Sequence, residues 1–205
     1  MLSRLDTWGL GLLSRRGIAP VVLVHKPYQA IADDQNQRQA ARYRAFYRRA
    51  ARILTMNQYT QDLMQDLYDV PSDRISRFRH PHFQPLLDRY EVDEDLARRL
   101  AAWAGDAPVI AFLSNMRPEQ GLDDLLAALP SLQNSVPDWR LLLISPGDRR
   151  EEIETHLANE GLSQRCWCHW ERYSYAHLRA FLRTASLVVT PYRWSAQSGV
   201  AVMAA

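Results

Sequence analysis

Short apolar runs alternate with longer segments of mixed polarity along this chain, and this alternation constrains the fold more than any other feature. The runs predict β-strands at residues 19–25, 51–57, 74–80, 108–114, 139–145, 165–170 and 186–192. Most of them have a core that is apolar throughout, as in "VVLV" and "LLLI", which is typical of strands buried on both faces of a sheet. The segments between them predict helices at about residues 34–50, 58–68, 92–104, 119–134, 149–160 and 174–184. This order predicts an α/β fold in which helices cover parallel sheets.

The segment from Phe83 to Gly105 interrupts the alternation. It has prolines near its edges and a helical pattern between them, but no apolar run that reads as a buried strand. Such a segment is typical of a connection between two sheet units. We therefore expect one unit in residues 1–84, a connection in residues 85–105 and a second unit in residues 106–205.

The composition narrows the class of protein. Apolar residues make up 47% of the chain, which is enough for a packed core and too much for a disordered protein. The 25 basic and 23 acidic residues are nearly balanced, so we expect no nucleic-acid partner. No apolar run approaches the roughly 18 residues of a membrane span, and the first residues lack the cleavage site of a signal peptide. We therefore expect a cytoplasmic protein.

Two features leave alternatives open. Arginines recur along the helical segment around residues 38–52, which allows peripheral contact with anionic lipid at the inner face of a membrane. A solvated helix face explains the same pattern more simply. Cys166, Cys168 and His169 lie together, but a zinc site needs four ligands in paired clusters and no second cluster exists. We therefore predict no metal site.

Ligands of open parallel sheets bind beyond the carboxyl ends of the strands, close to helix N-termini. Polar residues follow several of the predicted strands at such places. His25 ends the first strand, "SNMRPEQGLDDLLAAL" follows the strand at residues 108–114, and "TPYRWSAQSGV" follows the last apolar run. These stretches are the candidate binding segments.

The two motifs together resemble a family. Retaining glycosyltransferases of the GT-B type, specifically glycosyltransferase family 4, have a strand ending in G-x-I-R-P-x-K-G-L-x-x-L-L and a later strand ending in L-P-Y-R-x-x-x-Q-S-G-V. Both patterns occur here in the same order, and the resemblance extends over residues 19–205. It implies a Gln-Ser-Gly-Val subgroup member with two Rossmann-like parallel-sheet units facing each other. Both units are expected to be incomplete, with residues 1–84 as the C-terminal part of the acceptor-side domain and residues 106–205 as a donor-binding domain truncated at its C-terminus.

The resemblance implies transfer of a hexose from a nucleotide-diphosphate donor to an acceptor hydroxyl, with retention of configuration and without a metal or other cofactor. Negative charge that develops on the leaving diphosphate is stabilised by backbone amides at a helix N-terminus. His25 is implied as the catalytic residue that contacts the donor sugar. The implied donor-binding residues are Asn115, Arg117, Gln120, Gly121, Arg193, Gln197, Ser198, Gly199 and Val200. The acceptor is left open among a saccharide, a lipid-linked saccharide and a small molecule.

This chain departs from the family pattern at two positions. The usual phosphate-binding Arg and Lys are replaced by Asn115 and Gln120, and Arg117 and Arg193 are candidates to substitute for them. Loss of two charged contacts to phosphate favours an alternative, a non-catalytic GT-B-like binding or accessory protein. A dehydrogenase is disfavoured because no G-x-G-x-x-G follows any predicted strand.

Overall fold

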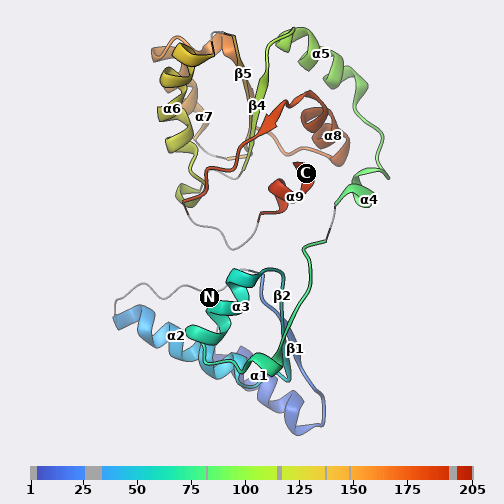
Figure 1. Cartoon of the computed structure of the whole chain (residues 1–205), viewed down its shortest axis with the longest axis vertical. Helices are drawn as coiled ribbons and strands as arrows, with labels where there is room; N and C mark the ends of the chain where they lie inside the picture. Colours follow the sequence, from blue (N-terminus) through green and yellow to red (C-terminus); the bar gives the residue numbers. More distant parts are fainter. Residues whose placement is uncertain are drawn as a thin grey trace. The chain divides into compact units, whose positions relative to one another are not determined.

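The computed structural model describes residues 4–25, 34–81, 83–114, 117–136, 138–147, 149–193 and 198–204. The chain divides into two compact units, Met1–Pro81 and His82–Ala205 (Figure 1). Among the described residues, no helix is both long enough and apolar enough to span a bilayer.

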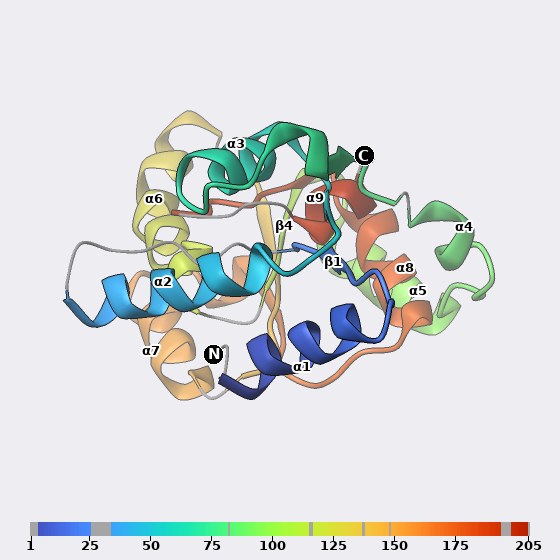
Figure 2. The ribbon, with the colours of Figure 1, turned by 90° about the horizontal axis from the view of Figure 1, so that it is seen from below.

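The first unit is a three-stranded parallel sheet in the order β1-β2-β3. Its elements are α1 (Arg4–Arg15), β1 (Val21–Leu23), α2 (Asp34–Tyr47), β2 (Arg52–Thr55), α3 (Gln58–Asp66), the 3₁₀ turn η1 (Ser72–Arg74) and β3 (Ile75–Arg77). The helices α1 and α2 lie beside each other (Figure 2). Ile53 of β2 and Met64 of α3 are fully buried in the core of this unit, packed with Tyr47 and Tyr68. This packing explains why an apolar strand and an amphipathic helix occur in succession here.

The second unit is a four-stranded parallel sheet in the order β6-β5-β4-β7. Its strands are β4 (Val109–Leu113), β5 (Arg140–Ile144), β6 (Cys166–His169) and β7 (Leu187–Val188). Its helices are α4 (Gln84–Leu87), α5 (Glu94–Ala104), α6 (Leu122–Ser135), α7 (Arg150–Asn159), α8 (Tyr175–Thr184) and α9 (Gly199–Ala204), with 3₁₀ turns η2 (Pro118–Gln120) and η3 (Ser163–Arg165).

Two apolar cores lie on the two faces of this sheet. Leu142 and Ile144 of β5 pack with α5 and α8 on one face, while Leu141 and Leu143 pack with α6 and α7 on the other (Figure 1). All four side chains are fully buried. A strand covered by helices on both faces has no interior position for a polar side chain, which is why residues 141–144 of β5 are all apolar.

The segment expected to connect the units has a structural role in the second one. Asp93 caps α5 by accepting a hydrogen bond from the backbone N–H of Leu96 at 2.9 Å. Leu96 and Leu100 are buried with Leu178 of α8 in the same core. The division between the units accordingly falls at Pro81, before the predicted connection at residues 85–105, because the apolar face of α5 packs against α8.

Candidate active site

The sheet of the second unit reverses its strand order beside β4. The chain runs from β4 outward to β5 and β6 and then returns to β7, on the other side of β4. The connections that follow β4 and β7 therefore diverge at neighbouring carboxyl ends. This is the place where open α/β sheets bind ligands. Both family-like motifs of the sequence follow these two strands.

The two motifs are in direct contact at Gly121. This residue has φ 74° and ψ 22°, a left-handed conformation that glycine adopts most readily, and it lies between η2 and α6. A Cβ placed on Gly121 would be 1.8 Å from the carbonyl oxygen of Pro191. Only glycine allows the loop after β4 to approach the loop after β7 this closely.

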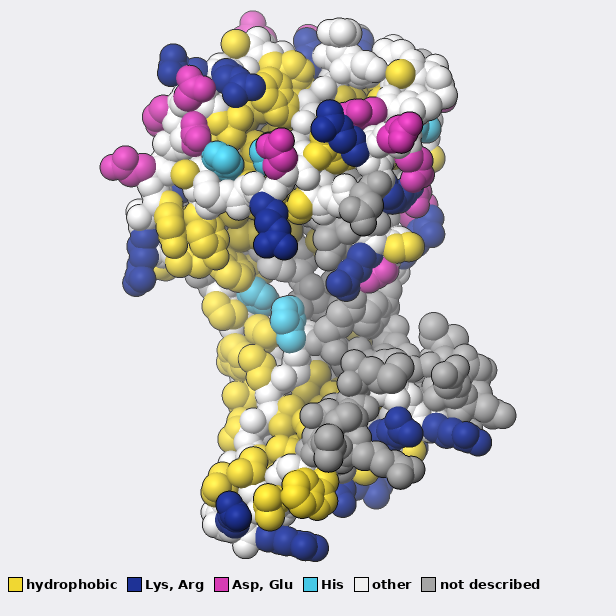
Figure 3. Space-filling view, turned by 180° about the vertical axis from the view of Figure 1, so that it is seen from behind, with side chains coloured by type: hydrophobic (Ala, Val, Ile, Leu, Met, Phe, Trp, Pro, Cys, Tyr) yellow, Lys and Arg dark blue, Asp and Glu magenta, His cyan; other side chains and the backbone are white. Residues whose placement is uncertain are grey.

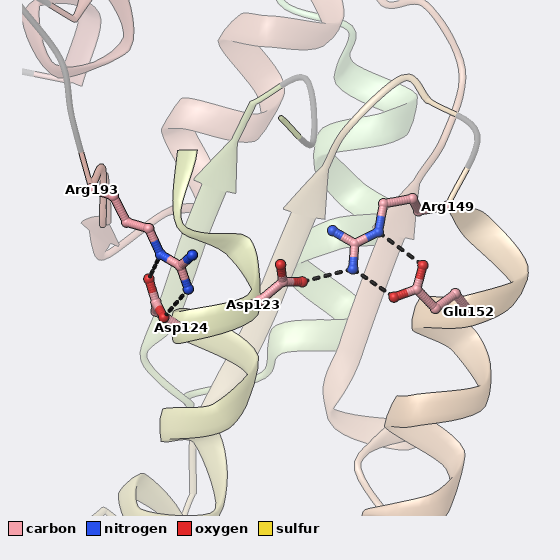
Figure 4. Close-up of polar contacts among 5 residues, drawn as sticks. All are labelled: Asp123, Asp124, Arg149, Glu152 and Arg193. Atoms are coloured by element: carbon pink, nitrogen blue, oxygen red, sulfur yellow. Dashed lines mark hydrogen bonds and ion pairs between the residues drawn. The ribbon is translucent and has the colours of Figure 1, made fainter. Parts of the chain in front are cut away.

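Arg193 adds polar contacts between the same loops. Its backbone N–H donates to the carbonyl oxygen of Glu119 at 3.0 Å. Its guanidinium donates from Nε and Nη2 to the two carboxylate oxygens of Asp124, each at 2.6 Å (Figure 4). This hydrogen bonding lowers the pKa of Asp124 and raises the pKa of Arg193. The predicted donor-binding residue Arg193 is thus already paired with the first turn of α6.

A second arginine contacts the same helix turn. Arg149, at the start of α7, donates to Asp123 at 2.7 Å and to Glu152 at 2.6 and 2.9 Å (Figure 4). These contacts raise the pKa of the arginine and lower the pKa of Glu152. The first turn of α6 is therefore held from two sides by cations that come from the β7 and β5 connections.

Serines fix the carboxyl ends of the central strands. The fully buried hydroxyl of Ser145, after β5, donates to the carbonyl oxygen of Ser114, after β4, at 2.6 Å. The hydroxyl of Ser114 donates in turn to Oε1 of Gln120 at 2.9 Å. Gln120, which occupies the place of the family's lysine, therefore has its amide oxygen engaged within the protein.

The helix after β7 begins at Gly199, and Ser198 caps it. The hydroxyl of Ser198 accepts from the N–H of Ala201 at 3.1 Å and donates to the Tyr192 hydroxyl at 3.2 Å. Val200 packs against the core that contains α5 and α8. Of the predicted Gln-Ser-Gly-Val segment, the described residues Ser198, Gly199 and Val200 form the half-buried start of α9, and the serine oxygen satisfies one of the free amides of this helix.

The remaining predicted site residues occupy different situations. Arg117 is exposed next to η2, and within the described part of the chain its guanidinium has no hydrogen-bond or ion-pair partner. Asn115 and Gln197 lie outside the described residues. His25 is exposed near the carboxyl end of β1, in the first unit. Across the described ranges, no group of three or more His, Cys, Asp or Glu is arranged to hold a metal ion.

Sequence reasoning did not identify three residues that order this site. Asp123, Asp124 and Arg149 were not among the candidates. Acidic residues in the first turn of a helix are common because they complement its dipole, so the two aspartates carry no distinctive signal. The ordering role of Arg149 depends on the packing of α6 beside α7, which no local pattern contains.

This chain is similar in sequence and in fold to known glycosyltransferases. Residues 107–205 match the model of the family described as Glycosyl transferases group 1. A GDP-mannose-dependent alpha-(1-6)-phosphatidylinositol monomannoside mannosyltransferase of Mycolicibacterium smegmatis is 33% identical over 79 residues, covering 38% of this chain and 21% of that protein. The crystal structure of HepE from Anabaena in complex with UDP has a TM-score of 0.76 at 16% identity, over 97% of this chain and 54% of HepE.

A UDP-forming trehalose-phosphate synthase from Burkholderia xenovorans has a TM-score of 0.69 at 11% identity, over 98% of this chain and 54% of the synthase. The chain thus spans about half the length of these solved structures and about a fifth of the curated relative. The structural matches confirm the predicted fold class, an α/β fold of the GT-B type with two parallel sheets.

Proposed function

We propose that this chain is part of a retaining glycosyltransferase of family 4, in the Gln-Ser-Gly-Val subgroup. It transfers a hexose from a nucleotide-diphosphate sugar to an acceptor hydroxyl and needs no metal. The contact between Gly121 and Pro191 carries the proposal, because it joins the two motifs that resemble this family at the ligand-binding edge of the sheet. The family match of residues 107–205 and the UDP complex of HepE support the same reaction class.

In the proposed mechanism, residues of the second unit stabilise the charge of the leaving diphosphate. Arg117 is the cation best suited to bind a phosphate oxygen, because it is exposed and uncommitted among the described residues. Arg193 retains N–H donors beyond those that it gives to Asp124, and the carboxylate keeps its planar group in a fixed orientation. Backbone amides around Ser198 and Gly199 add further donors to the diphosphate.

His25 is proposed to act from the first unit on the donor sugar, and Asn115, Gln120, Gln197 and Val200 to complete the donor site. The proposed location is the cytoplasm, and peripheral contact with the inner face of a membrane is compatible with it. The expectation that both units are incomplete stays a prediction.

Nucleotide binding separates this proposal from its alternative. UDP and GDP are titrated calorimetrically into the full chain and into the Arg117→Gln variant, with Arg98→Gln as a control of equal charge change on the exposed face of α5. We expect saturable binding of one nucleotide, weakened about tenfold or more by Arg117→Gln and unchanged by Arg98→Gln, because a hydrogen bond to a charged group contributes about 1.5–3 kcal/mol. No saturable binding of either nucleotide at millimolar concentration would remove the transferase proposal.

A non-catalytic binding or accessory protein is the second candidate, favoured by Gln120, whose neutral amide is engaged by Ser114. Its distinguishing result is saturable nucleotide binding without release of sugar from the matching nucleotide sugar. Phosphorus NMR measures that release directly, with water or an added saccharide as acceptor.

A further inference from the structure

The first unit has a depression of its own at the carboxyl ends of β2 and β3. Its volume is about 400 Å³, and its lining residues are Met56, Asn57, Gln58, Arg77, Phe78 and Arg79. All of them belong to the first unit, so the depression exists independently of the donor site of the second unit. It lies at the edge of a parallel sheet where ligands bind.

The lining combines positive charge with an exposed aromatic ring. Arg77 and Arg79 are exposed, Phe78 between them is 37% exposed, and no Asp or Glu is among the lining residues. Within the described part of the chain, the Arg79 side chain has no hydrogen-bond or ion-pair partner. Two guanidinium groups without a lining carboxylate attract an anion such as a phosphate, two of whose oxygens can accept the paired N–H groups of one guanidinium.

Hydrogen bonds hold one of the two cations in place. Nη1 of Arg77 donates to Oε1 of Gln58, whose amide nitrogen donates to Oδ1 of Asp62 at 2.7 Å. The neighbouring Asn57 is fixed as the cap of α3, because its Oδ1 accepts from the N–H of Thr60 at 2.7 Å. Arg77 is therefore oriented through a neutral amide and keeps its charge uncompensated by a direct carboxylate contact.

The charge of the whole unit supports the same ligand class. Residues 1–81 contain thirteen Lys and Arg and seven Asp and Glu, whereas residues 82–205 contain twelve and sixteen. On the side of the molecule that Figure 3 draws, the coloured side chains of the first unit are mainly basic and hydrophobic, while acidic side chains stand among basic ones on the second unit. A net positive unit raises the local concentration of anionic ligands.

We propose that Arg77 and Arg79 bind a phosphate group of a second ligand in this depression, with Phe78 packing against the carbon skeleton that carries it and Gln58 positioning Arg77. Under the function proposed above, this ligand is the acceptor, since the phosphates of the donor are assigned to the second unit. That identification depends on the proposed function, but the anion site itself does not. The acceptor is then a phosphate-bearing molecule, either a soluble sugar phosphate or a lipid headgroup.

The test uses sn-glycerol 3-phosphate as a phosphomonoester probe, with glycerol as its uncharged counterpart, at constant ionic strength. Binding is followed by NMR through the Nε–H signals of the arginines in the full chain. We expect saturable shifts of Arg77 and Arg79 with glycerol phosphate and none with glycerol. Arg77→Gln and Arg79→Gln should each weaken binding about fivefold or more, whereas Arg16→Gln, an equal charge change at the end of α1, should not.

Vesicles distinguish the two sources of phosphate. Cosedimentation with phosphatidylglycerol vesicles, absent with phosphatidylcholine and lost in Arg77→Gln, identifies a lipid headgroup, while binding of the soluble probe alone identifies a sugar phosphate. Absence of binding in both arms, or an equal loss in Arg16→Gln, overturns the proposal. Circular dichroism and the thermal midpoint confirm that each variant is folded. Because UDP and GDP are not involved, the outcome is independent of the nucleotide test of the second unit.

Discussion

Replacing Gly121 by alanine tests whether the loops after β4 and β7 form one packed unit. The added Cβ would lie 1.8 Å from the carbonyl oxygen of Pro191 and 2.7 Å from its carbonyl carbon. Ordinary contacts begin at about 3.4 Å, so the oxygen would have to move by about 1.6 Å, the difference between the two distances. The obstructing atoms are backbone atoms, so no change of side-chain rotamer relieves the overlap.

The expected magnitude follows from two costs. A left-handed backbone costs an alanine roughly 1–2 kcal/mol, and overpacking of a close contact costs roughly 1–3 kcal/mol. Gly121→Ala should therefore lower the free energy of unfolding of the second unit by about 2–5 kcal/mol. Gly161→Ala provides a matched control, because Gly161 has φ 67° and nothing lies within 4 Å of its added Cβ. The control should show only the backbone cost.

Urea unfolding followed by tryptophan fluorescence and circular dichroism measures both variants against the unchanged chain. The nucleotide titration is repeated on the folded Gly121→Ala protein, where we expect weaker binding because the displaced β7 loop carries Arg193. Equal losses of unfolding free energy in the two variants would refute the reasoning, since the contact with Pro191 would then contribute nothing.

Three further predictions concern the polar groups of the same edge. Arg193→Gln should raise the pKa of Asp124 toward its ordinary value, and an NMR titration of the carboxyl group measures this change. In the unchanged protein, the ion pair is fully formed above the ordinary carboxyl pKa of about 3.9. It is lost as the pH falls through the lowered pKa of Asp124. Ser145→Ala should lower the unfolding free energy by roughly 1–2 kcal/mol, because a buried carbonyl loses its donor, whereas the exposed Ser131→Ala should leave urea unfolding unchanged. Burial lowers the pKa of His169 because it disfavours the charged imidazolium. The folded state therefore has its full stability above the ordinary histidine pKa of about 6.5. This contribution is lost as the pH falls through the lowered pKa, because the unfolded chain binds the proton more readily. His169→Asn should flatten that part of the pH dependence of unfolding, and an unchanged slope would count against the burial effect.

The sequence predicted the central strands of the second unit well because β4 and β5 are buried between helices on both faces of the sheet. A run such as Leu141–Ile144 cannot be accommodated on a surface, so its position is readable without a structure. The meeting of the two motifs was also predictable, since parallel strands place their carboxyl ends at one edge.

Other features depended on contacts between distant residues. The pair Arg193–Asp124 joins positions 69 residues apart, and no local pattern indicates which carboxylate an arginine contacts. The helix α1 was not predicted, because glycines interrupt its pattern and its support comes from packing beside α2. The run containing Val21 and Leu23 predicted a strand buried on both faces, yet these side chains are 57% and 52% exposed. Which side chains of β1 are buried therefore depends on the elements that pack against the strand, and not on how apolar the strand is.

The touching backbones of Gly121 and Pro191 also constrain any exchange of the two loops that contain them. A loop taken from a protein of similar fold has a backbone path that fits its own neighbouring loop. In this chain it would have to pack against backbone atoms, and no side chain at the closest contact could change rotamer to make room. Exchanging both connections as a matched pair preserves that fit, so the pair is the smallest portable element of this edge.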